Sequence, residues 1–358
     1  MTAEFSIAGR PIGPGQPVYI IAELSANHRH DEGVAAELVR AAHEAGADAV
    51  KLQTYTPDTI TIASDAPSFR AGSGSLWAGT TLHDLYGEAY MPWAWQPGLK
   101  VLAESLGMHC FSSPFDPTAV DFLLAMDVPA FKVASFELVD LPLIRRMAAT
   151  GRPLIMSTGM ASEAEIDEAV TAARDAGATE IALLKCTSAY PSPPEAVNLR
   201  AIPAMIERWG LPVGLSDHTT GELVPVAAVA LGACIVEKHM TLSRADETPD
   251  SAFSLDRNDF RTMVDAIRTA ELALGAPRLG PTDEEMESRR FRRSLFVVED
   301  VDAGEVLTDR NVRSIRPADG LHTRYLDEVL GRRAARAISK GTPLDWDLLE
   351  PAEATTAP

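Results

Sequence analysis

The chain has 358 residues, of which 46% are hydrophobic and 23% charged, a composition typical of a globular protein with a sizeable core. Its formal charge of −19 argues against a nucleic acid or an anionic membrane surface as the main partner. No apolar run approaches the roughly 20 residues of a membrane span, and residues 1–12 lack the features of a signal peptide. We therefore expect a cytoplasmic protein.

The three cysteines support the same expectation. Cys110, Cys186 and Cys234 are an odd number, far apart in the sequence, and each lies inside an apolar run. This pattern predicts buried, reduced thiols rather than disulfides or a catalytic nucleophile.

Short apolar runs alternate with helical patterns up to about residue 275 and predict a parallel sheet. The first segment, residues 5–17, predicts a small hairpin that closes one face of this sheet. Eight strands are expected, at residues 18–22, 48–53, 108–113, 130–135, 153–158, 180–186, 212–216 and 234–239. Helices are predicted between them, for example over 34–46 and 163–177, and a last one over 256–275. Eight such units favour a closed (β/α)8 barrel over a doubly wound sheet.

Two segments depart from this alternation. Residues 56–92 are too long for an ordinary strand-to-helix connection and predict an ordered loop over the active end of the barrel. After residue 275 the sequence pattern changes and predicts short strands and turns. We predict a barrel domain over 1–275, a linker over 276–290 and a compact second domain over 291–352.

Nearly every predicted strand ends in polar residues, and the ends of barrel strands build active sites. Only six of the 32 basic residues are lysines, and Lys51, Lys132, Lys185 and Lys238 lie at or near strand ends. Lysines among several serines suit a phosphate and a carboxylate, although any single serine there could simply cap a helix. Lys238 is the exception, because strand alternation places it on the face opposite Glu237 and His239.

Two histidines end neighbouring predicted strands. His218 and His239 are 21 residues apart, which is one strand-helix repeat, so both imidazoles should reach the same rim. Two histidines with open positions suit a divalent metal that also holds water or substrate. Spacing alone leaves helix capping as an equal alternative.

Eight motifs, in this order and spacing, resemble the sialic acid synthase family, and in particular its pseudaminic acid synthase branch. They read "IAELSANH", "KLQTYTPDTIT", "SSPFD", "FKVASFE", "STGM", "LLKCTSAYPSP", "GLSDHT" and "EKHMTL". The similarity covers nearly the whole chain, and the C-terminal part resembles the antifreeze-like SAF domain. It implies a TIM barrel followed by an SAF domain.

The resemblance implies condensation of phosphoenolpyruvate with an open-chain amino sugar, which gives a nine-carbon 2-keto acid and phosphate. For the pseudaminic branch the sugar is 2,4-diacetamido-2,4,6-trideoxy-L-altropyranose. N-acetylneuraminate or legionaminic acid synthesis by the same chemistry is the alternative. His218 and His239 would bind Mn²⁺ or Mg²⁺, which tips the interpretation of this pair toward a metal site.

The resemblance also assigns roles to the residues of the rim. Glu23 would be the general acid or base. Contacts to substrate are expected from Lys51, Ser113, Lys132, Ser135, Glu137, Ser157, Ser188, Tyr190, Ser216, Glu237 and Asp250. Asn27 and Lys185 are expected to contact substrate as well, because they lie at or just after the ends of predicted strands. Arg316, in "SIRPADG", would reach the sugar from a partner subunit, which implies a domain-swapped homodimer.

The chain departs from the family pattern at two places. Arg29 and His30 stand where Asn-Gly is usual, and Thr248 stands where Gly precedes Pro-Asp.

Two other functions compete with the synthase. One is an aldolase that uses a Schiff-base lysine, Lys132 or Lys185. The other is a non-catalytic sugar-binding protein, which predicts an incomplete polar rim.

Overall fold

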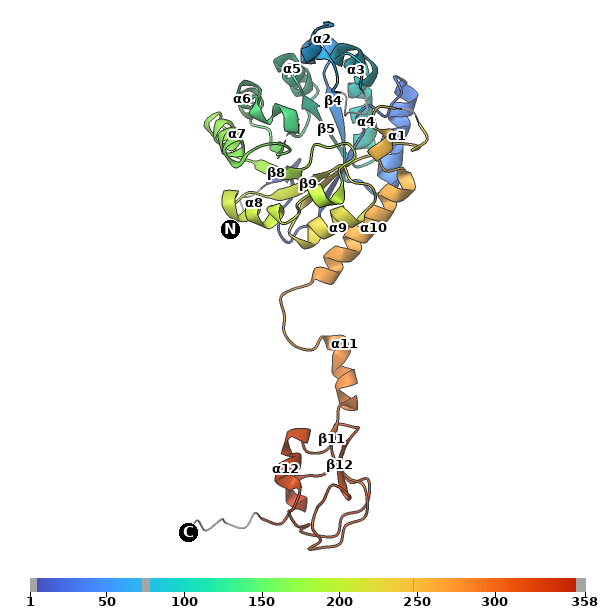
Figure 1. Ribbon diagram of the computed structural model, residues 1–358, viewed down its shortest axis with the longest axis vertical. Coiled ribbons are helices and arrows are strands. Elements are labelled where there is room, and N and C mark those ends of the chain that lie inside the picture. Colours follow the sequence, from blue (N-terminus) through green and yellow to red (C-terminus); the bar gives the residue numbers. More distant parts are fainter. Residues whose placement is uncertain (1–4, 73–77, 247, 352–358) are drawn as a thin grey trace. The chain divides into compact units, whose positions relative to one another are not determined.

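We describe a computed structural model that covers residues 5–72, 78–246 and 248–351. The chain divides into two compact units, one that ends at Gly275 and one that begins at Ala276. The first is a closed barrel surrounded by helices, as Figure 1 shows, and the second is a small unit of short strands and turns. No helix of the described residues is long and apolar enough to cross a membrane.

The barrel consists of eight parallel strands in the order β10-β3-β4-β5-β6-β7-β8-β9, which confirms the predicted (β/α)8 barrel. Each strand lies within one or two residues of its predicted position. Their bounds are β3 Tyr19–Glu23, β4 Ala49–Thr54, β5 His109–Pro114, β6 Phe131–Val133, β7 Leu154–Ser157, β8 Ile181–Cys186, β9 Val213–Asp217 and β10 Ile235–His239.

Each strand is followed by a helix of the outer ring. These are α1 Glu32–Glu44, α4 Gln96–Ser105, α5 Pro117–Ala125, α6 Leu141–Ala148, α7 Glu163–Asp175, α8 Ala201–Trp209, α9 Leu223–Ala230 and α10 Arg257–Leu274. The predicted start of α7 is confirmed, because Ser162 and Glu165 form a capping box.

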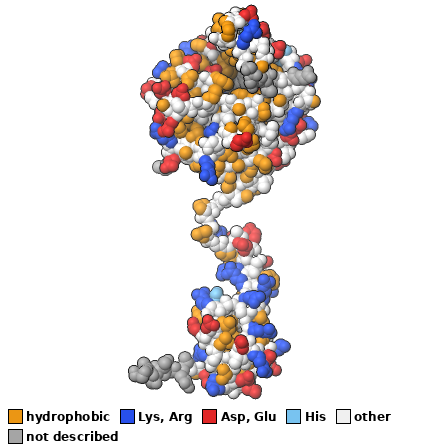
Figure 2. Space-filling view, viewed as in Figure 1, with side chains coloured by type: hydrophobic (Ala, Val, Ile, Leu, Met, Phe, Trp, Pro, Cys, Tyr) orange, Lys and Arg blue, Asp and Glu red, His pale blue; other side chains and the backbone are white. Residues whose placement is uncertain are grey.

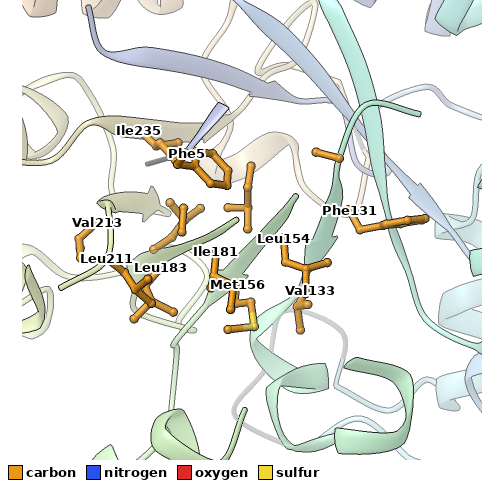
Figure 3. Close-up of a cluster of buried hydrophobic side chains, with 14 of the residues drawn as sticks. Phe5, Phe131, Val133, Leu154, Met156, Ile181, Leu183, Leu211, Val213 and Ile235 are labelled. Atoms are coloured by element: carbon orange, nitrogen blue, oxygen red, sulfur yellow. The ribbon is translucent and has the colours of Figure 1, made fainter. Parts of the chain in front are cut away.

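Strand alternation explains both the core and the site. On β10, Ile235 belongs to the apolar core together with Phe5 of the N-terminal segment, as Figure 3 shows. Successive side chains point to opposite faces of a strand, so Glu237 and His239 continue the column that Ile235 begins. The interior of the barrel is therefore apolar at the amino ends of its strands and polar at the carboxyl ends. The predicted hairpin, β1 Ser6–Ile7 with β2 Arg10–Pro11, is also present.

The long segment between β4 and α4 is more regular than predicted. It contains two helices, α2 Pro57–Ile60 and α3 Leu82–Ala89, where the sequence predicted an ordered loop. Thr81 caps α3 by accepting a hydrogen bond from the backbone N–H of Asp84. The Pro, Gly, Ser and Thr content around α3 masked its helical pattern in the sequence. Part of this segment, residues 73–77 with Trp77, lies outside the described residues.

The second unit contains β11 Ser294–Val297, paired antiparallel with β12 Val312–Ile315, and the short helix α12 Leu326–Val329. Its own core includes Leu295, Val297 and Leu344, among others. The predicted linker contains a further short helix, α11 Asp283–Met286. Lys and Arg side chains are scattered over the visible face of this unit, with Asp and Glu side chains among them (Figure 2).

Candidate active site

A pocket of about 680 Å³ opens at the carboxyl ends of the barrel strands. Its lining comes from segments that follow most of the strands, which is where barrel enzymes bind their substrates. Eleven of the predicted site residues line it: Lys51, Lys132, Ser135, Glu137, Ser157, Tyr190, Ser216, His218, Glu237, His239 and Asp250.

Two lysines and two glutamates form a buried cluster on the pocket floor. Lys51 Nζ lies 2.5 Å from Glu23 Oε2 and 3.4 Å from Glu237 Oε2. Lys132 Nζ lies 3.9 Å from Glu237 Oε1. The two cations and two anions balance, which makes their burial tolerable. An anionic substrate that binds the lysines must compete with the glutamates for them.

Burial shifts the pKa values of this cluster in opposite directions. It raises the pKa of Glu23 to about 7, an effect that Lys51 opposes and the neighbouring Glu237 reinforces. Burial also lowers the pKa of Lys132 to about 8, against the attraction of Glu237. The pKa of Glu237 itself is lowered, because Lys132 and Lys51 outweigh the effect of burial. One acid of the cluster therefore exchanges its proton near neutral pH while the other stays ionised.

Hydroxyl groups surround the lysines. Lys132 Nζ donates to Ser157 Oγ at 2.6 Å, and Ser216 Oγ donates to Glu237 Oε1 at 2.9 Å. Ser113 Oγ is buried and has no hydrogen-bond partner within the described part of the chain. Buried polar groups in native proteins are nearly always paired, so this hydroxyl is suited to a polar ligand.

Gly159 brings two further serines close together. Its backbone N–H donates to Ser135 Oγ at 3.1 Å. A Cβ atom at this position would lie 2.7 Å from Ser135 Oγ and 2.2 Å from Ser188 Oγ. Only glycine therefore allows both hydroxyls and a backbone amide to converge at this point.

The two predicted metal ligands lie side by side. His239 is the last residue of β10 and His218 follows β9, and their ring centroids are 5.2 Å apart. Phe253 packs against the ring of His239 at 5.0 Å, and Tyr190 against that of His218 at 4.4 Å. Asp250 Oδ2 lies 3.6 Å from His239 Nδ1.

Each imidazole offers a nitrogen for coordination. His218 Nδ1 lies 3.0 Å from the carbonyl oxygen of Thr187, which can only accept, so Nδ1 is the donor and Nε2 is the nitrogen that can coordinate a metal. His239 Nδ1 is buried without a hydrogen-bond partner among the described residues. Burial, with the charges of Lys51 and Lys132 adding to it, holds the pKa of His239 well below its ordinary value, so its ring is neutral.

This donor set fits a divalent ion that keeps open positions. Within residues 5–72, 78–246 and 248–351, no three His, Cys, Asp or Glu side chains form a ready metal site. A site with two protein ligands leaves room for water and substrate oxygens, unlike a closed structural zinc site.

Comparisons with known proteins agree with this geometry. Residues 38–278 match the NeuB family, and residues 292–350 match the SAF domain. The chain belongs to the NeuB family. It is 45% identical to a pseudaminic acid synthase of Helicobacter pylori, over 94% of this chain and 98% of that protein.

More distant relatives are also similar along nearly their whole length. An N,N'-diacetyllegionaminic acid synthase of Legionella pneumophila is 34% identical, over 95% of this chain and 97% of that protein. The crystal structure of the spore coat polysaccharide biosynthesis protein spsE of Bacillus subtilis is 32% identical and covers 98% of this chain and 100% of its own, with a TM-score of 0.66. These comparisons confirm the family that the sequence motifs predicted and the architecture of a barrel followed by an SAF domain.

Some predicted residues do not line the pocket of this NeuB-family protein. Lys185 points away from it, because the next residue on β8, Cys186, faces inward; Lys185 Nζ donates instead to the carbonyl oxygen of Cys186 at 2.6 Å. Asn27 is buried in the loop after β3, where its amide donates to Met240 O and accepts from Thr248 Oγ1. Asn27 thus supports the loop that follows β10 rather than the pocket surface.

Arg316 is exposed in the second unit, after β12. Glu23, Ser113 and Ser188 are not part of the pocket lining; Glu23 lies just beneath the floor, where it contacts Lys51.

The departure from the family pattern at Arg29 and His30 is accommodated locally. Arg29 and His30 both have a left-handed φ of 53°, a conformation that Asn and Gly adopt readily and that explains their usual presence there. Here Arg29 forms an ion pair with Asp246, and the His30 ring packs on Tyr90 at 5.0 Å.

Sequence reasoning missed several pocket residues. Ser25 and Gln53 line the pocket, and Gln53 Nε2 donates to Ser25 Oγ at 2.9 Å. Cys186 is a buried free thiol, as predicted, and it also lines the pocket and lies 3.9 Å from His218 Nδ1. Its inward position follows from the same alternation that turns Lys185 outward, and this signal was available in the sequence.

Proposed function

We propose that the chain is a pseudaminic acid synthase. It condenses phosphoenolpyruvate with the open-chain form of 2,4-diacetamido-2,4,6-trideoxy-L-altrose and releases phosphate. The observation that supports this most strongly is the convergence of Lys51, Lys132, His218 and His239 in one pocket of a NeuB-family barrel. The identity of 45% to a pseudaminic acid synthase supports this acceptor over that of the legionaminic acid synthases, at 34%.

Phosphoenolpyruvate is proposed to bind across the lysines and hydroxyls of the floor. Lys132, with Ser157 at 2.6 Å, offers a compact cation and a short hydrogen bond to an anionic oxygen. The backbone amide of Gly159, with Ser135 and Ser188, forms a second group of polar contacts. A phosphate and a carboxylate require two such groups.

His218 and His239 are proposed to hold a Mn²⁺ or Mg²⁺ ion, which would supply Lewis acidity for the aldehyde oxygen of the sugar. The Thr187 carbonyl fixes the tautomer and the orientation of His218. Phe253 and Tyr190 pack against the two rings and limit their rotation.

Glu23 is proposed to handle a proton of the reaction. C3 of phosphoenolpyruvate forms a bond to the aldehyde carbon, water adds at C2, and the C2–O bond to phosphate breaks. The aldehyde oxygen gains a proton, and the water loses one as it adds at C2. The C2 hydroxyl loses the second proton to the leaving phosphate as the ketone forms. A carboxyl group whose pKa is about 7 can do either near neutral pH, and Lys51, at 2.5 Å, holds it in place.

Arg316 is proposed to complete the site from a partner subunit in a domain-swapped homodimer. The described lining of the pocket contains no arginine. Arg316 is exposed in the SAF unit and is available for such a contact. The buried free thiols of Cys110, Cys186 and Cys234 support a reducing, cytoplasmic location.

The proposal is tested by phosphate release. Release is expected only when phosphoenolpyruvate, the trideoxy sugar and a divalent ion are all present, with EDTA abolishing it and Mn²⁺ restoring it. Equal release with N-acetylmannosamine would contradict the pseudaminic assignment but leave the synthase class intact. Borohydride trapping of a covalent adduct with a keto acid, and activity in EDTA, would indicate a Schiff-base aldolase instead.

A further inference from the structure

The pocket has two chemically different sides. The floor holds the buried lysines, glutamates and histidines described above. The opposite side, here called the apolar wall, consists of six hydrophobic or aromatic residues: Tyr55, Ile60, Leu82, Leu85, Tyr86 and Phe115. The chemistry of the floor accounts for phosphoenolpyruvate and the metal, and it leaves the wall without a role.

We propose that the apolar wall is the subsite for the methyl-bearing end of the acceptor. It would receive the 6-deoxy methyl group and an acetamido methyl group, and so select a diacetamido trideoxy sugar over a sugar that carries hydroxyls at these positions. This inference rests on the proposed function and names the residues that set its specificity.

Helix α3 is built to present this wall. Leu82, Leu85, Tyr86 and Ala89 are spaced i, i+3, i+4 and i+7, which places them on one helical face, and all four line the pocket. The opposite face is polar: Asp84 is exposed, and His83 Nε2 lies 3.0 Å from Asp58 Oδ1 of α2. The apolar face of α3 is therefore directed toward the pocket rather than toward solvent.

Aromatic contacts join α3 to the barrel. Tyr55, one residue after β4, is 3% exposed, and its ring makes edge contacts with Tyr86 at 5.7 Å and with Phe115, one residue after β5, at 5.1 Å. Three rings from separate segments thus form one continuous surface. Such a surface holds its shape when the pocket is empty, as a selective subsite requires.

A hydrogen-bonding group lies where the wall meets the floor. Glu137 Oε2 is buried and has no hydrogen-bond partner in the described part of the chain, and Glu137 lines the same pocket as Tyr86. An acetamido group combines an N–H donor with a methyl group. It matches a polar atom beside an apolar surface better than a hydroxyl does.

The size of the expected effect follows from apolar pockets in general. A missing methylene changes kcat/KM roughly 10- to 200-fold, and an added hydroxyl is rejected by roughly 100-fold. The wild-type protein should therefore prefer the 6-deoxy sugar over its 6-hydroxy analogue, with all other substituents equal, by about 100-fold in kcat/KM.

The test compares these two sugars in Leu82→Ser and Leu85→Ser. Leu82 is half-buried, so its replacement perturbs folding less than that of Leu85, which is 9% exposed. Each variant is expected to lower the preference for the 6-deoxy sugar at least about tenfold while KM for phosphoenolpyruvate stays at the wild-type value. Ile62→Ser is the matched control, because Ile62 lies in the same segment, is 58% exposed and does not line the pocket.

Two results would overturn the inference. One is an unchanged preference in both serine variants when their thermal unfolding matches that of the control. The other is an equal loss for both sugars together with a raised KM for phosphoenolpyruvate, which would mean that the wall supports the floor. Failure of the wild-type protein to release phosphate with either sugar would instead refute the proposed function itself.

Discussion

Asp217 and Lys238 form a buried ion pair immediately before the two histidines of the site. Lys238 Nζ lies 2.5 Å from Asp217 Oδ2, both side chains are at most 1% exposed, and Lys238 also donates to the carbonyl oxygen of Thr219. The pair lies on the outer face of β9 and β10, opposite the pocket. It joins the two strands at the level where they place His218 and His239.

Breaking this pair should loosen the site as well as the fold. Lys238→Met leaves the Asp217 carboxylate buried and unpaired, at a cost of about 3–5 kcal/mol in the free energy of unfolding. Denaturant unfolding measures this cost, and titration with Mn²⁺ should show weaker binding. Asp217→Asn combined with Lys238→Met removes both charges and should be more stable than Lys238→Met alone. A loss below about 1 kcal/mol in the single variant would contradict the structural role.

Strand alternation also shows which parts of the site could be predicted from the sequence. It correctly placed Lys238 on the face opposite Glu237 and His239, and both histidines were correctly predicted to lie at the same rim of the barrel. Applied equally to β8, it would have turned Lys185 outward and Cys186 inward, as the structure has them. Lys185 was predicted to bind the substrate because a lysine at a strand end suits an anion. The residue type alone does not determine to which face of the strand the side chain points.

Other features depend on contacts that no local pattern encodes. The strand positions follow from hydrophobic runs, and the end of α1 follows from a glycine stop. The pairing of Lys51 with Glu23 and Glu237 depends on how β3, β4 and β10 pack as neighbours. The apolar wall was missed because its members come from four separate segments, and the pattern of α3 is only eight residues long.

Metal binding should depend on both histidines. His218→Ala and His239→Ala each remove one of two protein ligands and should lower the affinity for Mn²⁺ at least about tenfold. Isothermal titration measures this without any need for activity. Tyr90→Phe is a suitable control, because Tyr90 packs on His30 away from the pocket lining. Wild-type metal affinity in either histidine variant would refute the two-histidine site.

Gly159 should tolerate no side chain. In Gly159→Ala the new Cβ would lie within 3 Å of Ser135 Oγ and Ser188 Oγ, so the two hydroxyls must move apart. KM for phosphoenolpyruvate should rise at least about tenfold if these groups bind it. Gly98→Ala is the control, since the nearest atom to a Cβ there is 4.0 Å away. Unchanged KM in Gly159→Ala would exclude these serines from the binding site.

Loss of the Lys132 proton should weaken the binding of phosphoenolpyruvate at alkaline pH. Burial lowers its pKa to about 8, so the ammonium group is present below that pH and is lost as the pH rises through it. Above about pH 8, loss of the Lys132 proton should therefore lower the kcat/KM for phosphoenolpyruvate by about tenfold per unit, in addition to any change that Glu23 causes near pH 7. Lys185→Met is the control: it removes a lysine outside the pocket and should keep this profile.

Unfolding does not explain such a decline. An unfolded lysine keeps its proton up to its ordinary pKa of 10.5, so between about pH 8 and 10.5 the unfolded state binds more protons than the folded state. The contribution of Lys132 to stability therefore rises with pH across this window. A profile that stays level up to pH 10 would show that charged Lys132 does not bind the substrate.

Arg316→Ala should abolish condensation without affecting the dimer or the binding of Mn²⁺, because the guanidinium is proposed to act in the pocket of the partner subunit. Co-expression with Lys132→Ala separates this arrangement from action within one chain. In a mixed dimer with swapped SAF units, one pocket combines an intact Lys132 with an intact Arg316. Random mixing of the two inactive variants should then restore about a quarter of the wild-type activity, whereas unswapped chains would restore none.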